Sequence, residues 1–535
     1  MLLKRGNIKK EYPYYTVRRI ETLRDLILEN DTQYPDKTAF SYRNDGELVY
    51  KTYGDFAREV VSIGEWFTQE PAGKHIGIVG ENSYEWLLVY FAVVCSGNIA
   101  VPIDANLPTE TIQLLIEQSE CDIAFFSNAK KDITCKQQQG SEERISRNYK
   151  VFFMDELPKL INWGYSEIEC NHGRMKDICL RSSDIATIVF TSGTTGESKG
   201  VVLTHGNICA DIIHSCEMFT ISGGVVALLP FHHIFGMVVG IMMVYHYAYP
   251  VHINAGKRYI MRDIKELKPQ TLMLVPLYVE AFYKQIKRKI KQQGKEEKAK
   301  RMAKIALALL RVGIDIRRKV FVELLREFGG NLELIISGGA MLDPDYVNVF
   351  HEWGIEIHNG YGISECSSVI SVNRNLTNKP GSVGQVISGC EVKIDETGEI
   401  LVKGENVFSN YYKDEESTRT SFADGWYHTG DLGYFEDGFL YINGRKKNLI
   451  ILSNGENISP EGIEQELLKI DLISEIVVRG KGNSLEAEVF TEDSREKVRT
   501  IIEDWNKGQP PYKRIGNVVF RDDEFQKTTS KKIKR

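Results

Sequence analysis

Residues 185–200 combine an apolar run with a loop that could bind phosphate. The run at 185–190 has the composition of a buried β-strand, and Thr-Ser-Gly-Thr-Thr-Gly-Glu-Ser-Lys-Gly follows it at 191–200. Glycines let backbone N–H groups approach phosphate oxygens closely, and the hydroxyl groups and Lys199 add donors and positive charge. The Gly-x4-Gly-Lys-Ser/Thr spacing of a Walker A loop is absent. This density of Gly, Ser, Thr and Lys after a buried strand favours phosphate binding over a simple turn.

Six further motifs carry residue types that suit chemistry on an anionic substrate. They are Leu-Pro-Phe-His-His-Ile-Phe-Gly at 229–236, Ser-Gly-Gly-Ala at 337–340, Asn-Gly-Tyr-Gly-Ile-Ser-Glu at 359–365, Gly-Trp-Tyr-His-Thr-Gly-Asp at 425–431, Gly-Arg-Lys-Lys-Asn-Leu-Ile-Ile at 444–451 with Ser-Asn-Gly at 453–455 and Ile-Ser-Pro at 458–460, and Thr-Thr-Ser-Lys-Lys-Ile at 528–533. Taken singly, Glu365 could be a surface carboxylate, Asp431 a turn residue and His233 a core histidine. The ordered set is more specific than any one motif.

Together, the phosphate loop and these motifs resemble the adenylate-forming superfamily, which includes acyl-CoA synthetases, luciferases and the adenylation domains of nonribosomal peptide synthetases. The resemblance covers nearly the whole chain. It implies that a carboxylate attacks the α-phosphorus of ATP. Both reactants are anions, so the site must neutralise charge and align them. The resemblance further implies Mg²⁺ and, as co-substrate, coenzyme A.

The resemblance implies a set of ATP- and AMP-binding residues. They are Thr191, Ser192, Gly193, Thr194, Thr195, Gly196, Gly339, Ala340, Asn359, Gly360, Tyr361, Gly362, Ser364, Asp431 and Arg445. Tyr361 would stack on adenine, and core packing is its alternative role. Ser364 would donate to the α-phosphate, and Asp431 would accept from both ribose hydroxyls. Glu365, with Thr191, would hold Mg²⁺, which prefers oxygen ligands and usually takes few protein carboxylates.

The implied catalytic residues are Lys532, His233, Lys199 and Glu365. Lys532 would contact the carboxylate and the α-phosphate oxygens and stabilise charge in the transition state. Its neighbour Lys531 competes for this role, and a solvated basic tail is the structural alternative. The family usually has Pro and Gly near this lysine, where this chain has Gln526 and Lys531.

Other residues are implied in the transfer to a thiol. His233 would stand at the wall between the acyl group and the thiol tunnel. Lys447 matches the hinge, and rotation there would exchange Lys532 for the loop Ser453, Asn454 and Gly455, giving two half-reactions in one site. Gly455 would allow close approach of a pantetheine arm. Ser198 stands where the phosphate loop usually has Pro, which should alter loop stiffness rather than abolish binding.

The motifs favour a medium- or long-chain fatty acid as the substrate. Residues 231–236 contain no Asp to hold an α-amino group, unlike peptide-synthetase domains. The basic helical insert before the 337–340 turn and the 444–460 motif are similar to long-chain fatty acyl-CoA synthetases. A long-chain fatty acid–CoA ligase is therefore predicted. The alternatives are a fatty acyl-AMP ligase that loads an acyl carrier protein and a catalytically inactive relative that binds a nucleotide or a lipid.

The order of apolar segments predicts an α/β fold. Strand and helix signals alternate through residues 1–440, as parallel βαβ units require. Examples are a strand at 75–80, a helix at 84–96, a strand at 99–103, a helix near 109–119 and a strand at 122–127. We expect a large multi-lobed N-terminal domain at 1–444, with parallel sheets and a small β subdomain near 380–440. A small mobile α+β C-terminal domain is predicted at 445–535, with the boundary at Arg445–Lys447.

Bulk composition indicates a globular protein of more than one domain. The chain has 535 residues, 42% of them hydrophobic and 26% charged, and its net charge of -6 argues against nucleic acid as a partner. Nine cysteines without a CxxC pair, and an N-terminal segment without the apolar core of a signal peptide, predict reduced thiols in the cytoplasm.

A basic stretch at 284–301 stands apart from this composition. It holds nine Lys or Arg and two Glu, and Ile305, Leu309, Val312, Ile316, Val320 and Leu324 then recur at steps of three and four. This spacing predicts one apolar face of a continuous amphipathic helix. The basic stretch is either a solvated helix or a surface for anionic lipid or an acidic partner, and a peripheral membrane contact is the sharper hypothesis.

Overall fold

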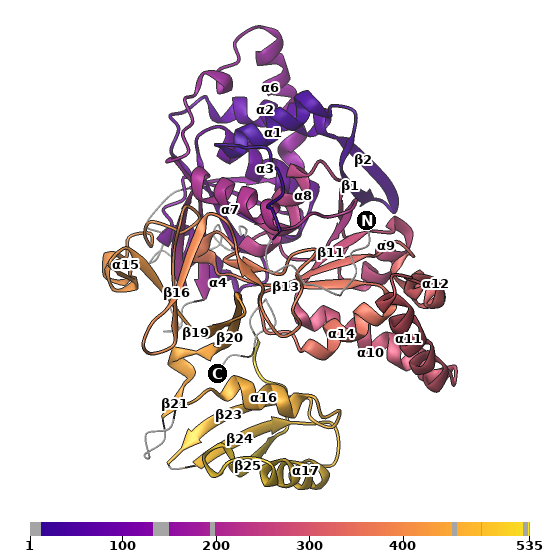
Figure 1. Ribbon diagram of the computed structural model, residues 1–535. Helices are drawn as coiled ribbons and strands as arrows, with labels where there is room; N and C mark the ends of the chain where they lie inside the picture. The colour runs from indigo at the N-terminus through magenta and orange to yellow at the C-terminus, as the bar shows by residue number, and fades with distance from the viewer. Residues whose placement is uncertain are drawn as a thin grey trace. The chain divides into compact units, whose positions relative to one another are not determined.

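The computed structural model describes residues 12–131, 149–192, 198–451, 457–482, 484–527 and 533 (Figure 1). The chain forms two compact units. The first comprises Met1–Pro380, Gly384–Glu391 and Lys403–Phe422, and the second Gly381–Val383, Val392–Val402 and Ala423–Arg535. Each unit has its own hydrophobic core.

A six-stranded sheet in the first unit has the order β6-β5-β3-β4-β7-β8. Its strands are β6 (Lys150–Phe153), β5 (Ile123–Phe126), β3 (His75–Gly80), β4 (Ile99–Asp104), β7 (Ile185–Ser192) and β8 (Ser198–Thr204). All neighbours are parallel except β7 and β8, which are antiparallel. β3 and β4 are buried on both faces, which explains their continuous apolar sequences.

A nine-stranded sheet completes the framework of the first unit, in the order β15-β14-β13-β12-β11-β9-β10-β1-β2. Its strands are β15 (Gln385–Val386), β14 (Ser371–Val372), β13 (Glu356–Tyr361), β12 (Leu334–Ser337), β11 (Thr271–Leu274), β9 (Val225–Ala227), β10 (Val251–Ile253), β1 (Thr38–Asn44) and β2 (Glu47–Thr52). The central strands β13 to β1 are parallel. Their carboxyl ends therefore meet at one edge, where ligands of such sheets bind.

Helices of the first unit cover both sheets (Figure 1). They are α1 (Leu23–Gln33), α2 (Tyr53–Phe67), α3 (Tyr84–Cys95), α4 (Thr109–Gln118), α6 (Leu157–Glu169), α7 (His205–Met218), the π-helix η4 (Phe235–Met242), α8 (Met243–His246), α9 (Ile260–Leu267), α10 (Pro276–Gln292), α11 (Glu296–Arg311), α12 (Arg317–Val320), α13 (Val322–Leu325), α14 (Pro344–Trp353) and α15 (Glu415–Ser421). α3 is buried along almost its whole length, as its apolar sequence predicts.

The prediction of one continuous amphipathic helix over residues 305–324 is wrong. α11 ends at Arg311, Gly313 adopts a left-handed φ of 87°, and only the short helices α12 and α13 follow. Asp315 accepts from the backbone N–H of Arg317 and fixes the start of α12. Val312 is 67% exposed, so it does not belong to the buried face that its spacing predicts.

The second unit carries three small sheets. The largest, which belongs for the most part to this unit, has the order β16-β17-β19-β18 with β20 paired to β19. Its strands are β16 (Cys390–Ile394), β17 (Glu399–Gly404), β18 (Phe422–Ala423), β19 (Trp426–Glu436) and β20 (Phe439–Arg445), and it corresponds to the predicted β subdomain.

The C-terminal part of the second unit is a small α+β fold. It comprises η8 (Lys446–Asn448), β21 (Ile450–Ile451), β22 (Asn457–Ile458), α16 (Pro460–Leu468), β23 (Glu475–Lys481), β24 (Ser484–Phe490), α17 (Arg495–Lys507) and β25 (Ile515–Arg521). β23, β24 and β25 form one sheet. The α/β fold with parallel sheets is thus confirmed, while the division at 444/445 and the mobility of 445–535 stay predictions. No helix in the described part of the chain is long and apolar enough to cross a membrane.

Candidate active site

The strands that flank the predicted phosphate loop form an antiparallel hairpin. Thr191 on β7 lies opposite Lys199 on β8, and β7 is also joined to β4 inside the six-stranded sheet. The sheet thereby holds Thr191 and Lys199 side by side. Several predicted loop residues, and the side chain of Ser192, lie outside the described residues: Gly193, Thr194, Thr195 and Gly196.

Residues 410–412 run along β8 next to Lys199. Val202 donates its backbone N–H to the carbonyl of Asn410, and Tyr412 donates to the carbonyl of Gly200 at 2.7 Å. A Cβ on Gly200 would lie 2.9 Å from a methyl carbon of Ile188, so the close packing of residue 200 on Ile188 requires glycine. The pairing brings Tyr411 to the lysine.

Lys199 lies between an aromatic ring and the start of α15. Its Nζ donates to Ser417 Oγ at 2.7 Å and stands 5.1 Å from the ring centroid of Tyr411. Asp414 caps α15 by accepting from the backbone N–H of Ser417. Hydrogen bonds from Ser417, together with the charge of Lys199, lower the pKa of Asp414.

Glu365 joins this cluster through the same tyrosine. The Tyr411 hydroxyl donates to Glu365 Oε1 at 3.0 Å, and the backbone N–H of Phe408 donates to the Glu365 carbonyl at 2.8 Å. Tyr411 thus contacts both Lys199 and Glu365, which are far apart in the sequence. A cation and a carboxylate predicted to act on ATP are therefore neighbours in the first unit.

The predicted adenine-side motifs stand at adjacent strand ends. Ser337 at the end of β12 pairs with Asn359 on β13 and with Leu274 at the end of β11. Gly339 follows with a left-handed φ of 82°, and Gly339 and Ala340 are exposed. Parallel pairing thus brings the 337–340 turn and the 359–362 motif to one edge of the nine-stranded sheet.

Gly360, near the end of β13, and Gly362, directly after it, pack closely against neighbouring backbone. A Cβ on Gly362 would lie 1.6 Å from the carbonyl oxygen of Ser368, and one on Gly360 would lie 3.1 Å from that of Ser371. Tyr361 and Ser364 are partly exposed beside these glycines. The tight backbone therefore presents Tyr361 and Ser364 at the strand end.

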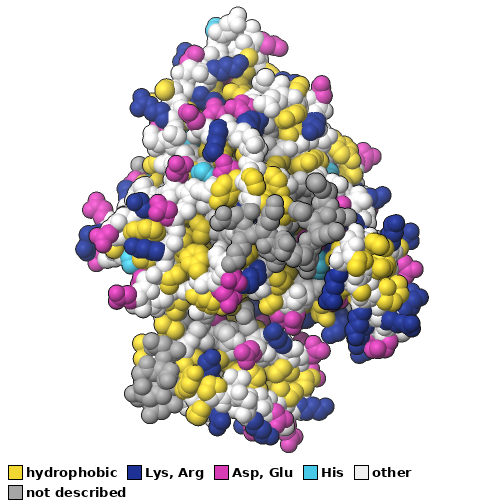
Figure 2. Space-filling model, viewed as in Figure 1, with side chains coloured by type: hydrophobic (Ala, Val, Ile, Leu, Met, Phe, Trp, Pro, Cys, Tyr) yellow, Lys and Arg dark blue, Asp and Glu magenta, His cyan; other side chains and the backbone are white. Residues whose placement is uncertain are grey.

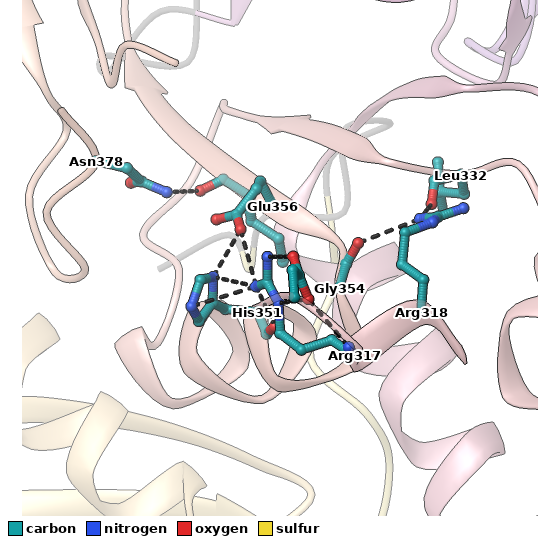
Figure 3. A network of polar contacts seen from close by, with 9 residues as sticks. Arg317, Arg318, Leu332, His351, Gly354, Glu356 and Asn378 are labelled. Atoms are coloured by element: carbon teal, nitrogen blue, oxygen red, sulfur yellow. Dashed lines mark hydrogen bonds and ion pairs between the residues drawn. The ribbon is translucent and has the colours of Figure 1, made fainter. Parts of the chain in front are cut away.

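A polar network fixes the opposite end of β13 (Figure 3). Arg317 Nη1 donates to the carbonyl of His351 at 2.7 Å, and His351 Nδ1 lies 2.7 Å from Glu356 Oε1 at the start of the strand. Burial raises the pKa of Glu356, but the His351 hydrogen bond and the Arg317 charge outweigh it and hold the pKa at about 2. Arg318 donates to the carbonyls of Leu332 and Gly354. These contacts make β13 a firm support for the site.

Asp211 and Asn406 form a buried polar hub under the Glu365 loop. Asn406 Nδ2 donates to the carbonyls of Cys366 (3.1 Å) and Val369 (2.8 Å) and to Asp211 Oδ1 (3.2 Å), which also accepts from the Val369 N–H. Burial raises the pKa of Asp211 well above its ordinary value. The hub ties the Glu365 loop to α7 and to the segment that carries Tyr411.

The aromatic–histidine motif leads into the π-helix η4. Asn82 holds the motif, because its side chain donates to the carbonyl of Leu229 and accepts from the N–H of Phe231. His233 is exposed, and its Nδ1 accepts from the N–H of Phe235 at 3.3 Å. It is therefore not a buried core histidine, which was its structural alternative.

An apolar gap lies between η4 and the nine-stranded sheet. Its cavity volume is about 10 Å³. The lining residues are Val225, Val226, Ala227, Leu228, Leu229, Gly236, Gly240 and Met273. A Cβ on Gly338 would lie 3.1 Å from the ring of Phe235, so the adenine-side turn and the start of η4 are in contact. This volume is far below the roughly 300 Å³ at which ligand pockets begin, so a long chain would have to open the gap.

The second unit holds the predicted ribose motif. Asp431 on β19 pairs with Arg445 on β20, and Arg445 Nε lies 2.8 Å from Asp431 Oδ1. Asp431 is buried, and its backbone N–H donates to Thr429 Oγ1 at 3.1 Å. Lys447 is exposed in η8, directly after β20. Asp431 and Arg445 are thus brought together, and Lys447 follows them.

Several predicted residues cannot be compared with the structure. Lys531 and Lys532, and the loop residues Ser453, Asn454 and Gly455, lie outside the described residues. Conversely, sequence reasoning missed Tyr411, Ser417, Asp211, Asn406 and Asn82. Their only sequence signal is an ordinary polar or aromatic side chain, and their roles become visible only through contacts with residues far along the chain.

Comparison with known proteins agrees with the fold. The family model described as AMP-binding enzyme matches residues 28–412, so the chain belongs to this family. "Long-chain-fatty-acid--CoA ligase FadD15" of Mycobacterium bovis is 27% identical over 90% of this chain and 83% of its own length. "Long chain acyl-CoA synthetase 7, peroxisomal" of Arabidopsis thaliana is 29% identical over 90% of this chain and 73% of its own.

Solved structures share the fold at lower identity. A complex of the anthranilate CoA ligase AuaEII with anthranoyl-AMP superposes with a TM-score of 0.76 at 18% identity, over 98% of this chain and 97% of that chain. The o-succinylbenzoate CoA synthetase MenE of Bacillus subtilis, in complex with ATP and magnesium ion, gives 0.72 at 22% identity, over 95% and 98%. These similarities establish the fold class, and the family establishes that the chain is an AMP-binding enzyme.

The residues present fit a magnesium ion at the ATP phosphates. No group of three or more His, Cys, Asp and Glu side chains that could hold a metal by itself occurs among the described residues. Glu365 supplies one carboxylate, held by the Tyr411 hydroxyl. Mg²⁺ usually takes one or two carboxylates and completes its shell with substrate phosphates and water, so one carboxylate is adequate beside ATP.

Proposed function

We propose that this protein is a long-chain fatty acid–CoA ligase of the AMP-forming type. It activates a medium- or long-chain fatty acid with ATP, releases pyrophosphate and then forms a thioester with coenzyme A. The observation that carries the proposal is the Lys199–Tyr411–Glu365 cluster, which joins a cation and a carboxylate beside the predicted phosphate loop. The names of the relatives from Mycobacterium and Arabidopsis support the same substrate class.

In the first half-reaction, a carboxylate oxygen of the acid attacks the α-phosphorus of ATP. The new bond is the acyl–phosphate bond, and the bond to the β-phosphate oxygen breaks, so pyrophosphate leaves with its electron pair. Lys199 and the 191–196 loop would bind the phosphates, and Ser364 would donate to the α-phosphate. Lys532 would neutralise the carboxylate and α-phosphate oxygens as charge builds. Magnesium, held by Glu365 and Thr191, would offset negative charge on the phosphates.

The nucleoside would be held by residues of several motifs. Tyr361 would stack on adenine at the end of β13, with Gly339, Ala340, Asn359, Gly360 and Gly362 forming the surrounding backbone. Asp431 would accept from the ribose hydroxyls. Its ion pair with Arg445 orients the Asp431 carboxylate for this task.

In the second half-reaction, the thiolate sulfur of coenzyme A attacks the acyl carbon. The carbon–sulfur bond forms, the bond from the acyl carbon to the phosphate oxygen breaks, and AMP leaves. Lys447 is the proposed hinge, and Ser453, Asn454 and Gly455 are the proposed thiol-side loop. His233, exposed before η4, would border the acyl group.

The acyl chain would enter the apolar gap beneath η4. Every lining residue is apolar or glycine, which suits a hydrocarbon chain and no α-amino group. π-helices are rare and often occur at functional sites. Movement of the π-helix η4 away from the sheet would widen the gap and admit a long acyl chain.

Location and partners follow the same proposal. The cytoplasm is our predicted location, although two plant relatives are named as peroxisomal. Free coenzyme A is the proposed acceptor, and an acyl carrier protein is the alternative acceptor. A peripheral membrane contact through residues 284–301 is part of the proposal.

The test is release of AMP and pyrophosphate with saturated and unsaturated acids from acetate to oleate, with and without coenzyme A. We expect release that depends on coenzyme A, with the highest kcat/KM for a medium or long acid. Trapped acyl-adenylate without a thioester to coenzyme A would instead favour a carrier-protein acceptor. No pyrophosphate release with any acid would contradict the proposal and favour an inactive nucleotide- or lipid-binding relative.

A further inference from the structure

Glu399 is a buried carboxylate of the second unit that lies outside all of the sequence motifs. It stands at the start of β17 and is only 3% exposed. Its backbone N–H donates to Asp395 Oδ1 at 2.8 Å, which fixes the start of the strand. A buried charge is costly unless other groups donate hydrogen bonds to it. The partners of Glu399 therefore show which parts of the chain it holds.

Three donors converge on the Glu399 carboxylate. The backbone N–H of Gly430 donates to Oε1 at 3.0 Å, Lys446 Nζ donates to Oε2 at 2.7 Å, and His428 Nδ1 lies 3.3 Å from Oε2. Burial acts to raise the pKa of Glu399, but these hydrogen bonds outweigh it and lower the pKa. The carboxylate in turn raises the pKa of Lys446. Glu399 and Lys446 therefore form a charged pair at neutral pH.

This pair adjoins the ion pair of Asp431 and Arg445, which we call the ribose pair. Gly430 immediately precedes Asp431, so the Glu399 carboxylate holds the backbone directly before the proposed ribose acceptor. Lys446 immediately follows Arg445, whose Nε lies 2.8 Å from Asp431 Oδ1. The contacts of Glu399 therefore reach both segments that carry the ribose pair.

Burial distinguishes the Glu399 contacts from the charges on the protein surface. Figure 2 shows Lys and Arg side chains interspersed with Asp and Glu side chains over the visible face. Contacts between such exposed side chains are screened by water and contribute little. Only the lysine of the Glu399–Lys446 pair reaches solvent. Loss of this partner would leave a buried carboxylate poorly compensated, so the pair holds the two segments more firmly than a surface contact would.

We propose that Glu399 is a positioning residue for the ribose of the bound nucleotide. It holds Gly430 and Lys446, and through them it orients Asp431 to accept from the ribose hydroxyls. Lys446 also directly precedes Lys447, the proposed hinge, so the ion pair keeps Asp431 on the ribose while the chain turns at Lys447. This role rests on the proposed function, in which Asp431 binds ribose.

The test compares the binding of AMP and of 2′,3′-dideoxy-AMP to the purified full-length chain by isothermal titration calorimetry. The wild-type chain should prefer AMP by about tenfold or more, because only AMP offers hydroxyls to Asp431. Lys446→Met and Glu399→Gln should each reduce this preference to less than about threefold, since a misoriented carboxylate accepts poorly. Both variants should keep their affinity for 2′,3′-dideoxy-AMP, which makes no contact through the ribose hydroxyls.

Three further variants separate the ion pair from a general effect on folding. Lys446→Arg can still donate to Glu399 and should keep the preference for AMP within about twofold of the wild type. Glu399→Gln combined with Lys446→Met should lose no more than either single variant, because both act through one contact. Lys481→Met removes the partner of Glu486 on a different sheet and should leave the preference unchanged. Melting temperatures show that each variant folds.

The yield of thioester gives a second readout. With oleate, ATP and coenzyme A, the wild-type chain should form equal amounts of pyrophosphate and acyl-CoA. Lys446→Met should form more pyrophosphate than acyl-CoA, because acyl-adenylate that is poorly held by Asp431 escapes before the thiol attacks.

The role of Glu399 is overturned if Lys446→Met and Glu399→Gln keep the wild-type preference for AMP, or if they weaken the binding of both nucleotides equally. A loss in Lys446→Arg as large as that in Lys446→Met would also overturn it. A wild-type chain that prefers AMP but forms no acyl-CoA would contradict the proposed function alone, and the binding assay would still decide the role of Glu399. A wild-type chain that binds neither nucleotide would overturn both.

Discussion

Removing the Tyr411 hydroxyl tests whether the cluster around Glu365 acts as a unit. Tyr411→Phe keeps the ring that packs on Phe408, with ring centroids 4.8 Å apart, and the ring face under Lys199. It removes the 3.0 Å hydrogen bond to Glu365 Oε1. A hydrogen bond to a charged group contributes about 1.5–3 kcal/mol. If Glu365 must be oriented by it when ATP binds, kcat/KM for adenylation should fall roughly 10- to 150-fold.

The neighbouring residue offers a matched control. The Tyr412 hydroxyl donates to Glu120 Oε2 at the same 3.0 Å, and neither residue is predicted to touch ATP. Tyr412→Phe should therefore leave adenylation within about threefold of the wild type, well below the loss that a charged hydrogen bond at the reacting site would cause. The assay is fatty-acid-dependent exchange of labelled pyrophosphate into ATP, with melting temperatures to show that both variants fold. Equal activity of the two variants would refute the reasoning.

Three other changes test the hub, the gap and the buried histidines. Burial raises the pKa of Asp211, so the neutral substitution Asp211→Asn should keep the melting temperature. Asp211→Ala leaves buried donors unpaired and should lower the free energy of unfolding by about 1–3 kcal/mol in chemical unfolding. Equal losses in the two variants would contradict a neutral Asp211. A Cβ on Gly240 meets nothing within 4 Å, so the side chain in Gly240→Leu should fill the apolar gap. The substitution should lower kcat/KM for oleate at least about tenfold more than for hexanoate, since deep pocket contacts serve only the longer acyl chain. An equal loss for both acids would place the acyl chain elsewhere. Burial lowers the pKa of His205 and His358 from 6.5 to about 4. As the pH falls below 6.5, the unfolded state therefore binds protons that the native state does not, and each histidine should lower the free energy of unfolding by up to about 2 kcal/mol at pH 5. An unchanged melting temperature between pH 7.5 and pH 5 would contradict this prediction.

Local patterns in the sequence predicted most of the framework. The apolar runs at 75–80 and 99–103 are β3 and β4, and the helix predicted at 84–96 is α3. These segments are buried on nearly all sides, so their composition alone identifies them. The spacing at 305–324 wrongly predicted a continuous helix. Gly313 and the hydrogen bond from Arg317 N–H to Asp315 divide the segment, and a periodic pattern alone does not reveal such a break.

The site was only partly predictable for a different reason. Lys199 and Glu365 stand inside short motifs, so residue type and spacing pointed to them. Their partners come from distant segments, because Tyr411 is 46 residues from Glu365 and Ser417 is 218 residues from Lys199. Such contacts are made by the pairing of residues 410–412 with β8, which no local pattern encodes.

The most direct test of the central claim uses oleic acid labelled with ¹⁸O in its carboxylate. The acid, ATP, Mg²⁺ and coenzyme A are incubated with the protein, and the nucleotide product is analysed by mass spectrometry. Attack of the carboxylate on the α-phosphorus predicts oleoyl-CoA together with AMP that carries one ¹⁸O atom. ADP with labelled inorganic phosphate, or AMP without the label, would contradict the acyl-adenylate account.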